Sequence, residues 1–86
     1  SDSIEDFNLI KDFIKKAKEY NVKIAIDDFG SGYSNFSRII DLNPDILKID
    51  GSLIKNIDTD KNKQKIVKSI IAFAKELKIQ TIAEYV

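Results

Sequence analysis

The chain has 86 residues, which is enough for one small domain or for a part of a larger one. Its 14 basic and 14 acidic residues cancel, so no basic surface is expected to neutralise the phosphates of a nucleic-acid polymer. The chain has no cysteine and no histidine, which excludes disulfides, thiolate or imidazole metal ligands and histidine bases. Any bound metal is therefore expected to be a hard cation with oxygen ligands, of the magnesium, manganese or calcium type.

Nothing in the sequence resembles a membrane segment. No apolar run approaches the roughly 20 residues that span a bilayer, and no signal peptide is visible at Ser1. We therefore expect a cytoplasmic chain with no direct membrane contact in this segment. A domain attached to a membrane through other parts of its protein would have the same pattern.

The first predicted element is a helix that begins after Ser3, whose hydroxyl is a good N-cap. Asn21 fits the left-handed residue that often ends a helix. The apolar run Val22–Ile26 then predicts a buried strand, which ends at two adjacent carboxylates, Asp27 and Asp28. The apolar face of the helix consists of residues at helical spacing, namely Phe7, Ile10, Phe13, Ile14 and Ala17.

The segment Phe29–Asn35 predicts a loop, because its glycines permit positive φ or a close backbone approach. A short helix is expected from Asn35 to about Asp41, ended by Asn43-Pro44. The second predicted strand, Asp45–Asp50, contains a lysine among apolar residues. Its period of two places Ile46, Lys48 and Asp50 on one face and Leu47 and Ile49 on the other.

The longest predicted helix, Lys61–Lys78, has capping residues in Asp58-Thr59-Asp60. A third strand, Ile79–Ala83, follows it and ends at Glu84. The sequence Ala17–Val22 resembles Ala74–Ile79, which indicates that the same helix-to-strand junction occurs twice. Continuing that alignment places Asp27 opposite Glu84.

Alternating helices and strands predict an α/β fold with parallel strands and helical crossovers. The carboxyl ends of parallel strands meet at one edge of the sheet, where ligands bind in α/β folds. We therefore expect Asp27, Asp28, Asp50 and Glu84 to gather along one rim with Lys48. Carboxylates and a lysine at such a rim suggest divalent-metal chemistry on a phosphorylated ligand.

Simpler explanations compete with this one. The two aspartates would also fit a helix cap or a solvated turn, and Lys48 could extend along the strand to water. Gly30-Ser31-Gly32 is not by itself a phosphate-binding loop, and Asp28-Phe29-Gly30 lacks the other kinase motifs. A phospho-acceptor fold would need a further strand between Asp28 and Lys48, and the sequence has none there.

Three segments, in order along the chain, resemble motifs of the EAL domain family, bacterial phosphodiesterases that hydrolyse cyclic di-GMP. Ile26–Ser34 resembles the signature Asp-Asp-Phe-Gly-Thr-Gly-Tyr-Ser, with Ser31 in place of threonine. Leu42–Asp50 resembles the following strand motif, which ends in Asp-x-Leu-Lys-Ile-Asp. Ile82–Val86 resembles Ala-Glu-Gly-Val-Glu, with Tyr85 in place of glycine. The resemblance covers the whole chain.

The resemblance implies a partial TIM-like (β/α) barrel of about three helix-strand units with parallel strands. In the family, the aspartates matching Asp27 and Asp28 bind a pair of Mg²⁺ or Mn²⁺ ions. The lysine matching Lys48 lies near the catalytic water, and the glutamate matching Glu84 completes the metal site. Asp50 would be a secondary site residue.

The resemblance also implies a reaction and a role for the loop. Water activated by two metal ions attacks one phosphodiester of cyclic di-GMP and gives linear pGpG. The loop matching Phe29–Asn35 is implicated in substrate binding, order of the metal site and dimerisation. Within it, the substrate-loop residues would be Phe29, Gly30, Ser31, Gly32, Tyr33 and Ser34.

Several parts of the family pattern are missing. The family's Glu-Ala-Leu motif, which lies upstream, has no counterpart in residues 1–86. The upstream asparagine and second glutamate that also hold metal in the family have none either. We expect residues 1–86 to be a fragment of one EAL domain, incomplete at both ends and inactive alone. It is expected to self-associate through the Phe29–Asn35 loop or exposed strand edges. The alternatives are a degenerate EAL domain that binds cyclic di-GMP without cleaving it, and a protein-interaction scaffold.

Overall fold

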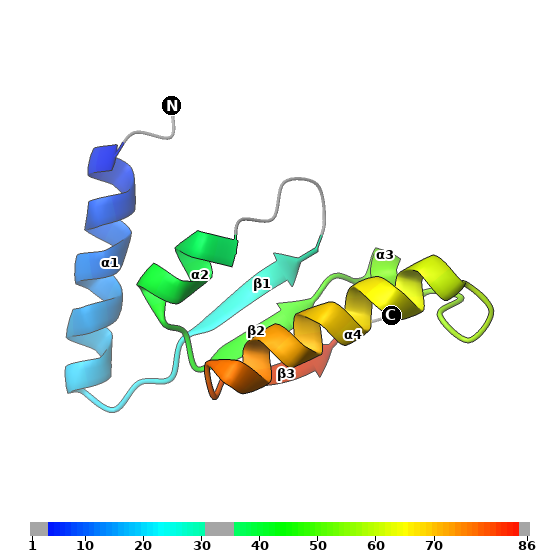
Figure 1. Ribbon diagram of the computed structural model, residues 1–86. Helices are drawn as coiled ribbons and strands as arrows, with labels where there is room; N and C mark the ends of the chain where they lie inside the picture. Colours follow the sequence, from blue (N-terminus) through cyan, green and yellow to red (C-terminus); the bar gives the residue numbers. More distant parts are fainter. Residues whose placement is uncertain (1–3, 31–35, 85–86) are drawn as a thin grey trace.

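A computed structural model of the chain describes residues 4–30 and 36–84 (Figure 1). Helices and strands alternate along the chain, with one additional short helix after the second strand. In chain order the elements are α1 (Ile4–Glu19), β1 (Ala25–Phe29), α2 (Phe36–Leu42), β2 (Ile46–Ile49), α3 (Gly51–Ile54), α4 (Lys61–Glu76) and β3 (Gln80–Ala83).

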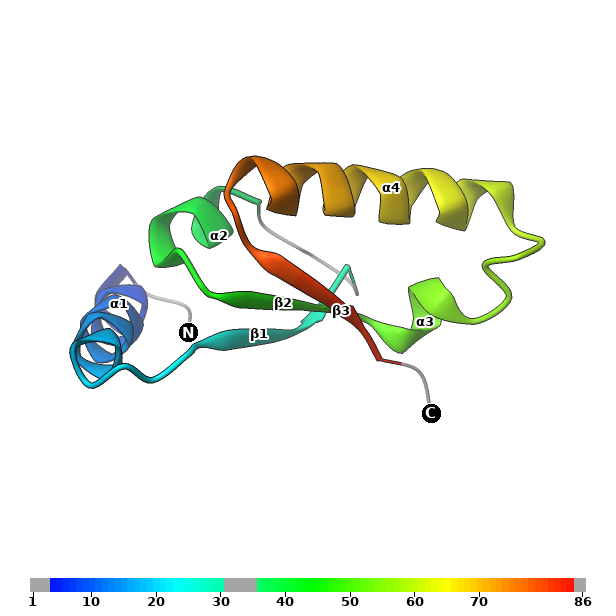
Figure 2. The ribbon, with the colours of Figure 1, turned by 90° about the horizontal axis from the view of Figure 1, so that it is seen from below.

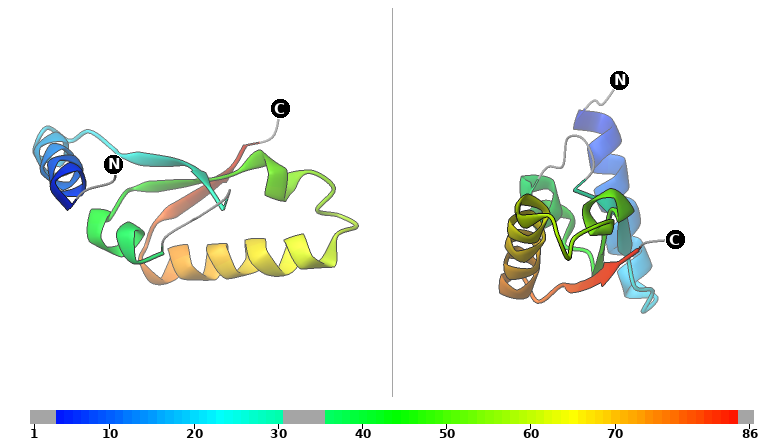
Figure 3. Two further views of the ribbon diagram at one scale, coloured as in Figure 1. Left: turned by 90° about the horizontal axis from the view of Figure 1, so that it is seen from above. Right: turned by 90° about the vertical axis from the view of Figure 1, so that its right-hand side faces the viewer.

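The strands form one sheet in the order β1-β2-β3, and both neighbouring pairs are parallel. This confirms the parallel arrangement predicted from the alternation of elements. Helices α2 and α4 lie on the same side of the sheet (Figures 2 and 3). In the described part of the chain, no helix covers the other side.

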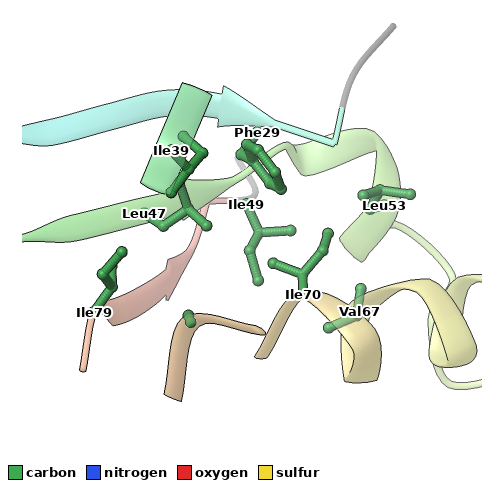
Figure 4. Close-up of a cluster of buried hydrophobic side chains, with 9 residues drawn as sticks. Phe29, Ile39, Leu47, Ile49, Leu53, Val67, Ile70 and Ile79 are labelled. Carbon is green, nitrogen blue, oxygen red and sulfur yellow. The ribbon is translucent and has the colours of Figure 1, made fainter. Parts of the chain in front are cut away.

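The core fills the space between the sheet and α4 (Figure 4). Leu47 and Ile49 of β2 are 0% and 2% exposed and point toward the helices. Lys48 lies between them in the strand and therefore faces the open side, where Ile82 is its partner in β3. The buried cluster consists of Phe29, Ile39, Leu47, Ile49, Leu53, Val67, Ile70, Ala74 and Ile79.

The repeated helix-to-strand junction is confirmed. Asn21 and Lys78 both have left-handed backbone, with φ of 62° and 60°. The amide of Val22 donates to the carbonyl of Ala17 at 3.2 Å, and the amide of Ile79 donates to that of Ala74 at 2.8 Å. These bonds close α1 and α4 with the same Schellman motif, which turns each helix directly into the segment before its strand.

The predicted bounds of the first strand are wrong. The prediction was Val22–Ile26, but β1 runs from Ala25 to Phe29 and includes both aspartates. The reason is burial: Val22 is 51% exposed beside the end of α1, whereas Phe29 is 5% exposed and packs in the core. The other predicted elements, which correspond to α1, α2, β2, α4 and β3, agree with the prediction to within one or two residues at each described end.

Helix α1 stands apart from the sheet and contacts α2 (Figure 1). Ile14 is its buried residue, whereas Ile10 and Phe13 are 48% and 70% exposed. Much of the apolar face predicted for this helix is therefore uncovered in the described structure. No helix among the described residues is long and apolar enough to cross a membrane.

Gly30 directly follows β1 and has a backbone conformation that favours glycine. Its φ is +99°, and an added Cβ would overlap Cδ1 of Leu53. Both the backbone and the packing thus disfavour a side chain, which confirms the expected use of glycine at this position. Gly30 thus lies between the end of β1 and Leu53, the buried residue of α3.

We predict that Gly30→Ala lowers the free energy of unfolding by about 1–3 kcal/mol, because it combines positive φ with an overlap onto Leu53. The measurement is chemical denaturation followed by far-UV circular dichroism. Gly51→Ala is the matched control, since Gly51 lies in α3 without positive φ, and it should leave stability unchanged or slightly raised. Equal losses for the two variants would contradict the prediction.

Candidate functional site

A β-bulge at the carboxyl end of β1 organises the candidate site. Ile26 pairs with Leu47 and Phe29 pairs with Ile49, so two residues of β1, Asp27 and Asp28, lie opposite one residue of β2. That one residue is Lys48. A bulge of this kind inserts an extra residue into one strand and is common beside active sites.

The sequence of the bulge suits its geometry. Asp28 has a φ of 54°, in the left-handed region that aspartate tolerates better than most residues. The amide of Asp28 donates a hydrogen bond of 3.0 Å to Oδ1 of Asp27. Both aspartates are exposed. The bulge therefore places two solvent-accessible carboxylate residues at the level of the lysine.

The core fixes the far side of the bulge. Phe29 follows Asp28 directly and is 5% exposed, and its carbonyl accepts a hydrogen bond of 2.9 Å from the amide of Asp50. Phe29 was expected in the substrate loop, but it lies in β1 and its side chain packs in the core. Ser31, Gly32, Tyr33 and Ser34 lie outside the described residues.

Lys48 forms an ion pair with Glu84, which follows β3, the strand on the opposite side of β2 from β1. Lys48 Nζ lies 3.5 Å from Glu84 Oε2, and the two side chains are 32% and 46% exposed. The amide of Glu84 donates to the carbonyl of Ile49 at 3.3 Å, which continues the pairing of β2 and β3 past the end of the strand. The predicted meeting of Lys48 and Glu84 at the rim is therefore present in the structure.

Asp50 has a structural task in addition to its place at the rim. Its carboxylate accepts a hydrogen bond of 3.0 Å from the amide of Ser52 and another from the Ser52 hydroxyl, and so caps α3. Its amide is bonded to the carbonyl of Phe29. Asp50 thus joins the end of β1 to the start of α3, a role that the sequence did not indicate.

The acids of the rim fit only part of a metal site. Asp27, Asp28 and Glu84 offer the hard carboxylate oxygens that divalent cations prefer. Within the described residues, however, no group of three or more acids lies close enough together to hold a metal ion. Strand β2 separates the aspartates from Glu84, whose contact is with Lys48. The described residues therefore do not make a complete metal site by themselves.

Comparison with known proteins decides the family. A family model described as "EAL domain" matches residues 1–86. The chain belongs to the EAL domain family. It is 42% identical over 83 residues to a protein of Borreliella burgdorferi named cyclic di-GMP phosphodiesterase PdeA, covering 96% of this chain.

Solved EAL structures have the same fold. A standalone versatile EAL protein from Vibrio cholerae O395, in its c-di-GMP-bound form, superposes with a TM-score of 0.88 at 40% identity over 100% of this chain. Klebsiella pneumoniae BlrP1, in a manganese/cy-diGMP complex at pH 9.0, superposes with a TM-score of 0.85 at 36% identity over 93% of this chain. This similarity confirms the predicted α/β class and the partial TIM-like (β/α) barrel.

The EAL chain described here is short beside these relatives. It spans 12% of the length of the Borreliella protein, 36% of the Vibrio chain and 20% of the Klebsiella chain. A further metal appears among the EAL relatives, since another BlrP1 structure is a calcium/cy-diGMP complex. Divalent cations and cyclic di-GMP are thus bound by proteins with this fold.

We predict that the Lys48–Glu84 pair contributes about 0.2–1 kcal/mol to stability, because both side chains are partly exposed and solvent screens the attraction. The measurement is a double-mutant cycle with Lys48→Met and Glu84→Gln, followed by chemical denaturation at low and high salt. The control is the Lys16–Glu19 pair of α1, at 3.9 Å and 69% and 59% exposed, which should couple no more strongly. A coupling above about 2 kcal/mol would show a structural role that the described geometry does not provide.

Proposed function

We propose that this chain is part of an EAL domain that hydrolyses cyclic di-GMP to linear pGpG. The observation that carries the proposal is the bulge, which places Asp27 and Asp28 opposite Lys48 at the carboxyl rim of a parallel sheet. Relatives named as cyclic di-GMP phosphodiesterases, from Borreliella burgdorferi and Escherichia coli, support the reaction.

Divalent cations belong to this proposal. Asp27 and Asp28 would supply carboxylate oxygens to a pair of Mg²⁺ or Mn²⁺ ions, which need further ligands because the described acids form no group of three or more that could hold a metal ion. Such ions, when bound, neutralise phosphodiester oxygens and lower the pKa of water. The manganese and calcium complexes of BlrP1 support the use of a divalent cation in this fold.

The chain's own residues have separable tasks in the proposed site. The ammonium of Lys48 lies on the open side of the sheet, where it can attract a phosphodiester or orient a water by hydrogen bonding. Glu84, 3.5 Å from that ammonium, limits where the lysine can reach. A direct contact between Glu84 and a metal ion stays a prediction, as do the substrate contacts of Gly30 and residues 31–34.

We further propose that residues 1–86 alone lack turnover. Two facts support this: the described acids form no group of three or more that could hold a metal ion, and the chain covers 36% of a standalone EAL protein. The isolated chain should therefore bind divalent cations weakly. The cytoplasmic location expected from the sequence stays a prediction.

We predict the activity of a chimera in which this chain replaces the matching segment of the Borreliella phosphodiesterase. It should convert cyclic di-GMP to pGpG in the presence of Mn²⁺, while the isolated chain should produce none. Asp28→Asn in the chimera should lower turnover by more than about 100-fold, because loss of a metal ligand costs more than loss of the groups that orient ligands. The measurement is pGpG formation by chromatography.

The matched control for this chimera is Asp41→Asn, the same change at an exposed aspartate of α2. It should leave turnover unaltered. A folded chimera that binds cyclic di-GMP without cleaving it would overturn the proposed hydrolysis and favour the nucleotide-receptor alternative. Manganese-dependent pGpG production by the isolated chain would refute the proposed lack of turnover.

We also propose that the isolated chain self-associates. The supporting observation is that β1 and β3 each pair on one side only in the described sheet, which leaves strand edges open to a second copy. The Phe29–Asn35 loop was the other expected contact. Phe29 is buried in the core, and residues 31–35 lie outside the described structure, so the strand edges carry this proposal.

We predict concentration-dependent association of the isolated chain in sedimentation velocity. The amides of Gln80 and Glu84 donate hydrogen bonds toward β2, so strand alternation turns the amide of Ala83 to the open edge of β3. Ala83→Pro removes that amide donor and should therefore weaken the association. Phe13→Lys on the exposed face of α1 is the control for non-specific apolar contact. A monomer at every concentration, or a loss of association only in Phe13→Lys, would contradict pairing through the strand edges.

A further inference from the structure

A row of three aromatic rings connects the bulge to two helices. The ring centroids of Phe29 and Phe36 are 5.1 Å apart with an interplanar angle of 88°. Those of Phe36 and Phe73 are 4.7 Å apart, also at 88°. Both contacts have the edge-to-face geometry that aromatic pairs favour. Phe36 is therefore the middle ring, between β1 and α4.

The middle ring differs from its neighbours in exposure. Phe29 is 5% exposed, and Phe36 is 42% exposed. Because much of the Phe36 side chain is exposed, it buries little apolar surface of its own. Its main contribution is therefore to hold the ring of Phe29 in position. Helix α2 has a separate anchor in the core, since Ile39 is 3% exposed. Removal of the Phe36 ring should therefore leave α2 in place and change the surroundings of Phe29.

The position of Phe29 determines the register of the bulge. Phe29 follows Asp28 directly, pairs with Ile49, and accepts a hydrogen bond from the amide of Asp50. If the ring of Phe29 were free to leave the core, β1 could slip to the register without an extra residue. Asp27 and Asp28 would then no longer both lie opposite the same residue of β2.

We propose that Phe36, supported by Phe73, is a positioning residue for the Asp27–Asp28 pair. It acts through its ring contact with Phe29, which follows Asp28 directly. The functional meaning of this positioning rests on the proposed function, in which the two aspartates bind divalent cations. The structural claim, that Phe36 holds the bulge, can be tested without that function.

The test is amide hydrogen exchange on the complete 86-residue chain, measured by NMR. The reporter is the amide of Asp50, bonded to Phe29, and the reference is the amide of Gln80, bonded to Asp45 at the opposite edge of the sheet at 3.0 Å. Phe36→Ala should accelerate exchange at Asp50 about tenfold and change Gln80 much less, because the opening is local. Phe36→Leu should restore most of the protection.

Ile40→Ala is the matched control, because Ile40 is 54% exposed on the same helix. It should alter neither amide. Equal acceleration at Asp50 and Gln80 in Phe36→Ala would show a general loss of stability, and no acceleration at Asp50 would show no role in the bulge. Either result overturns the proposal.

A second measurement separates this proposal from the proposed function. Mn²⁺ added to the wild-type chain should broaden the amide signals of Asp27 and Asp28, and Phe36→Ala should reduce that broadening at equal Mn²⁺ concentration. Broadening that is absent from the wild type counts against the cation site alone, because the exchange ratio still decides whether Phe36 holds the bulge. Broadening that is undiminished in Phe36→Ala overturns the positioning of the two carboxylates.

Discussion

The one extra residue in β1 is the constraint on which the rest of the site depends. Before the bulge, Ile26 pairs with Leu47 and faces the helices; after it, Phe29 pairs with Ile49 and again faces them. In a regular strand, residues three apart point to opposite faces, so without the bulge Phe29 would face the open side. The bulge keeps the core continuous and, by the same step, assigns two carboxylate residues to one position of the sheet. Its local cost is the left-handed backbone of Asp28.

The amino ends and the carboxyl ends of the strands are surrounded by different interactions. At the amino edge of the sheet, where the strands begin, the carboxylate of Asp45 accepts a 2.7 Å hydrogen bond from the amide of Ile24. The Lys18 ammonium donates a hydrogen bond to the carbonyl of Asn43. The carboxyl ends of α1, α2 and α4 lie next to this edge, where nearby lysines offset their partial negative charge. Satisfied bonds and balanced charge there stabilise the fold. The exposed residues Asp27 and Asp28, of which Asp28 has left-handed backbone, are at the carboxyl ends of the strands, as ligand sites in parallel α/β sheets are.

The elements, the parallel order and the repeated junction could be predicted because each depends on local sequence: helical spacing, a left-handed asparagine and alternating helices and strands. The bulge was not predicted, although the sequence contains its signal. Ile24 and Ile26 keep a period of two, and the next apolar residue, Phe29, is out of phase by one position. Such a shift indicates either the end of a strand or a bulge, and only the partner strand distinguishes them. The capping role of Asp50 likewise depends on where the following turn begins, which pattern alone does not determine.

The acids of the rim lie on strands that β2 separates, and among the described residues they do not form one group. Neighbouring strands lie about 4.8 Å apart, so residues at one level of β1 and β3 are about 10 Å apart across β2. In the described structure the carboxylate of Glu84 contacts the ammonium of Lys48, and no group of three or more acids lies close enough together to hold a metal ion. The alignment of Asp27 with Glu84 in the repeated sequence is therefore a likeness of position along the chain. In space, a lysine lies at the level between them, and Glu84 contacts its ammonium. The rim is an alternation of charges, negative, positive and negative, across three neighbouring strands, which suits the proposed cations at Asp27 and Asp28 and the proposed phosphodiester near Lys48.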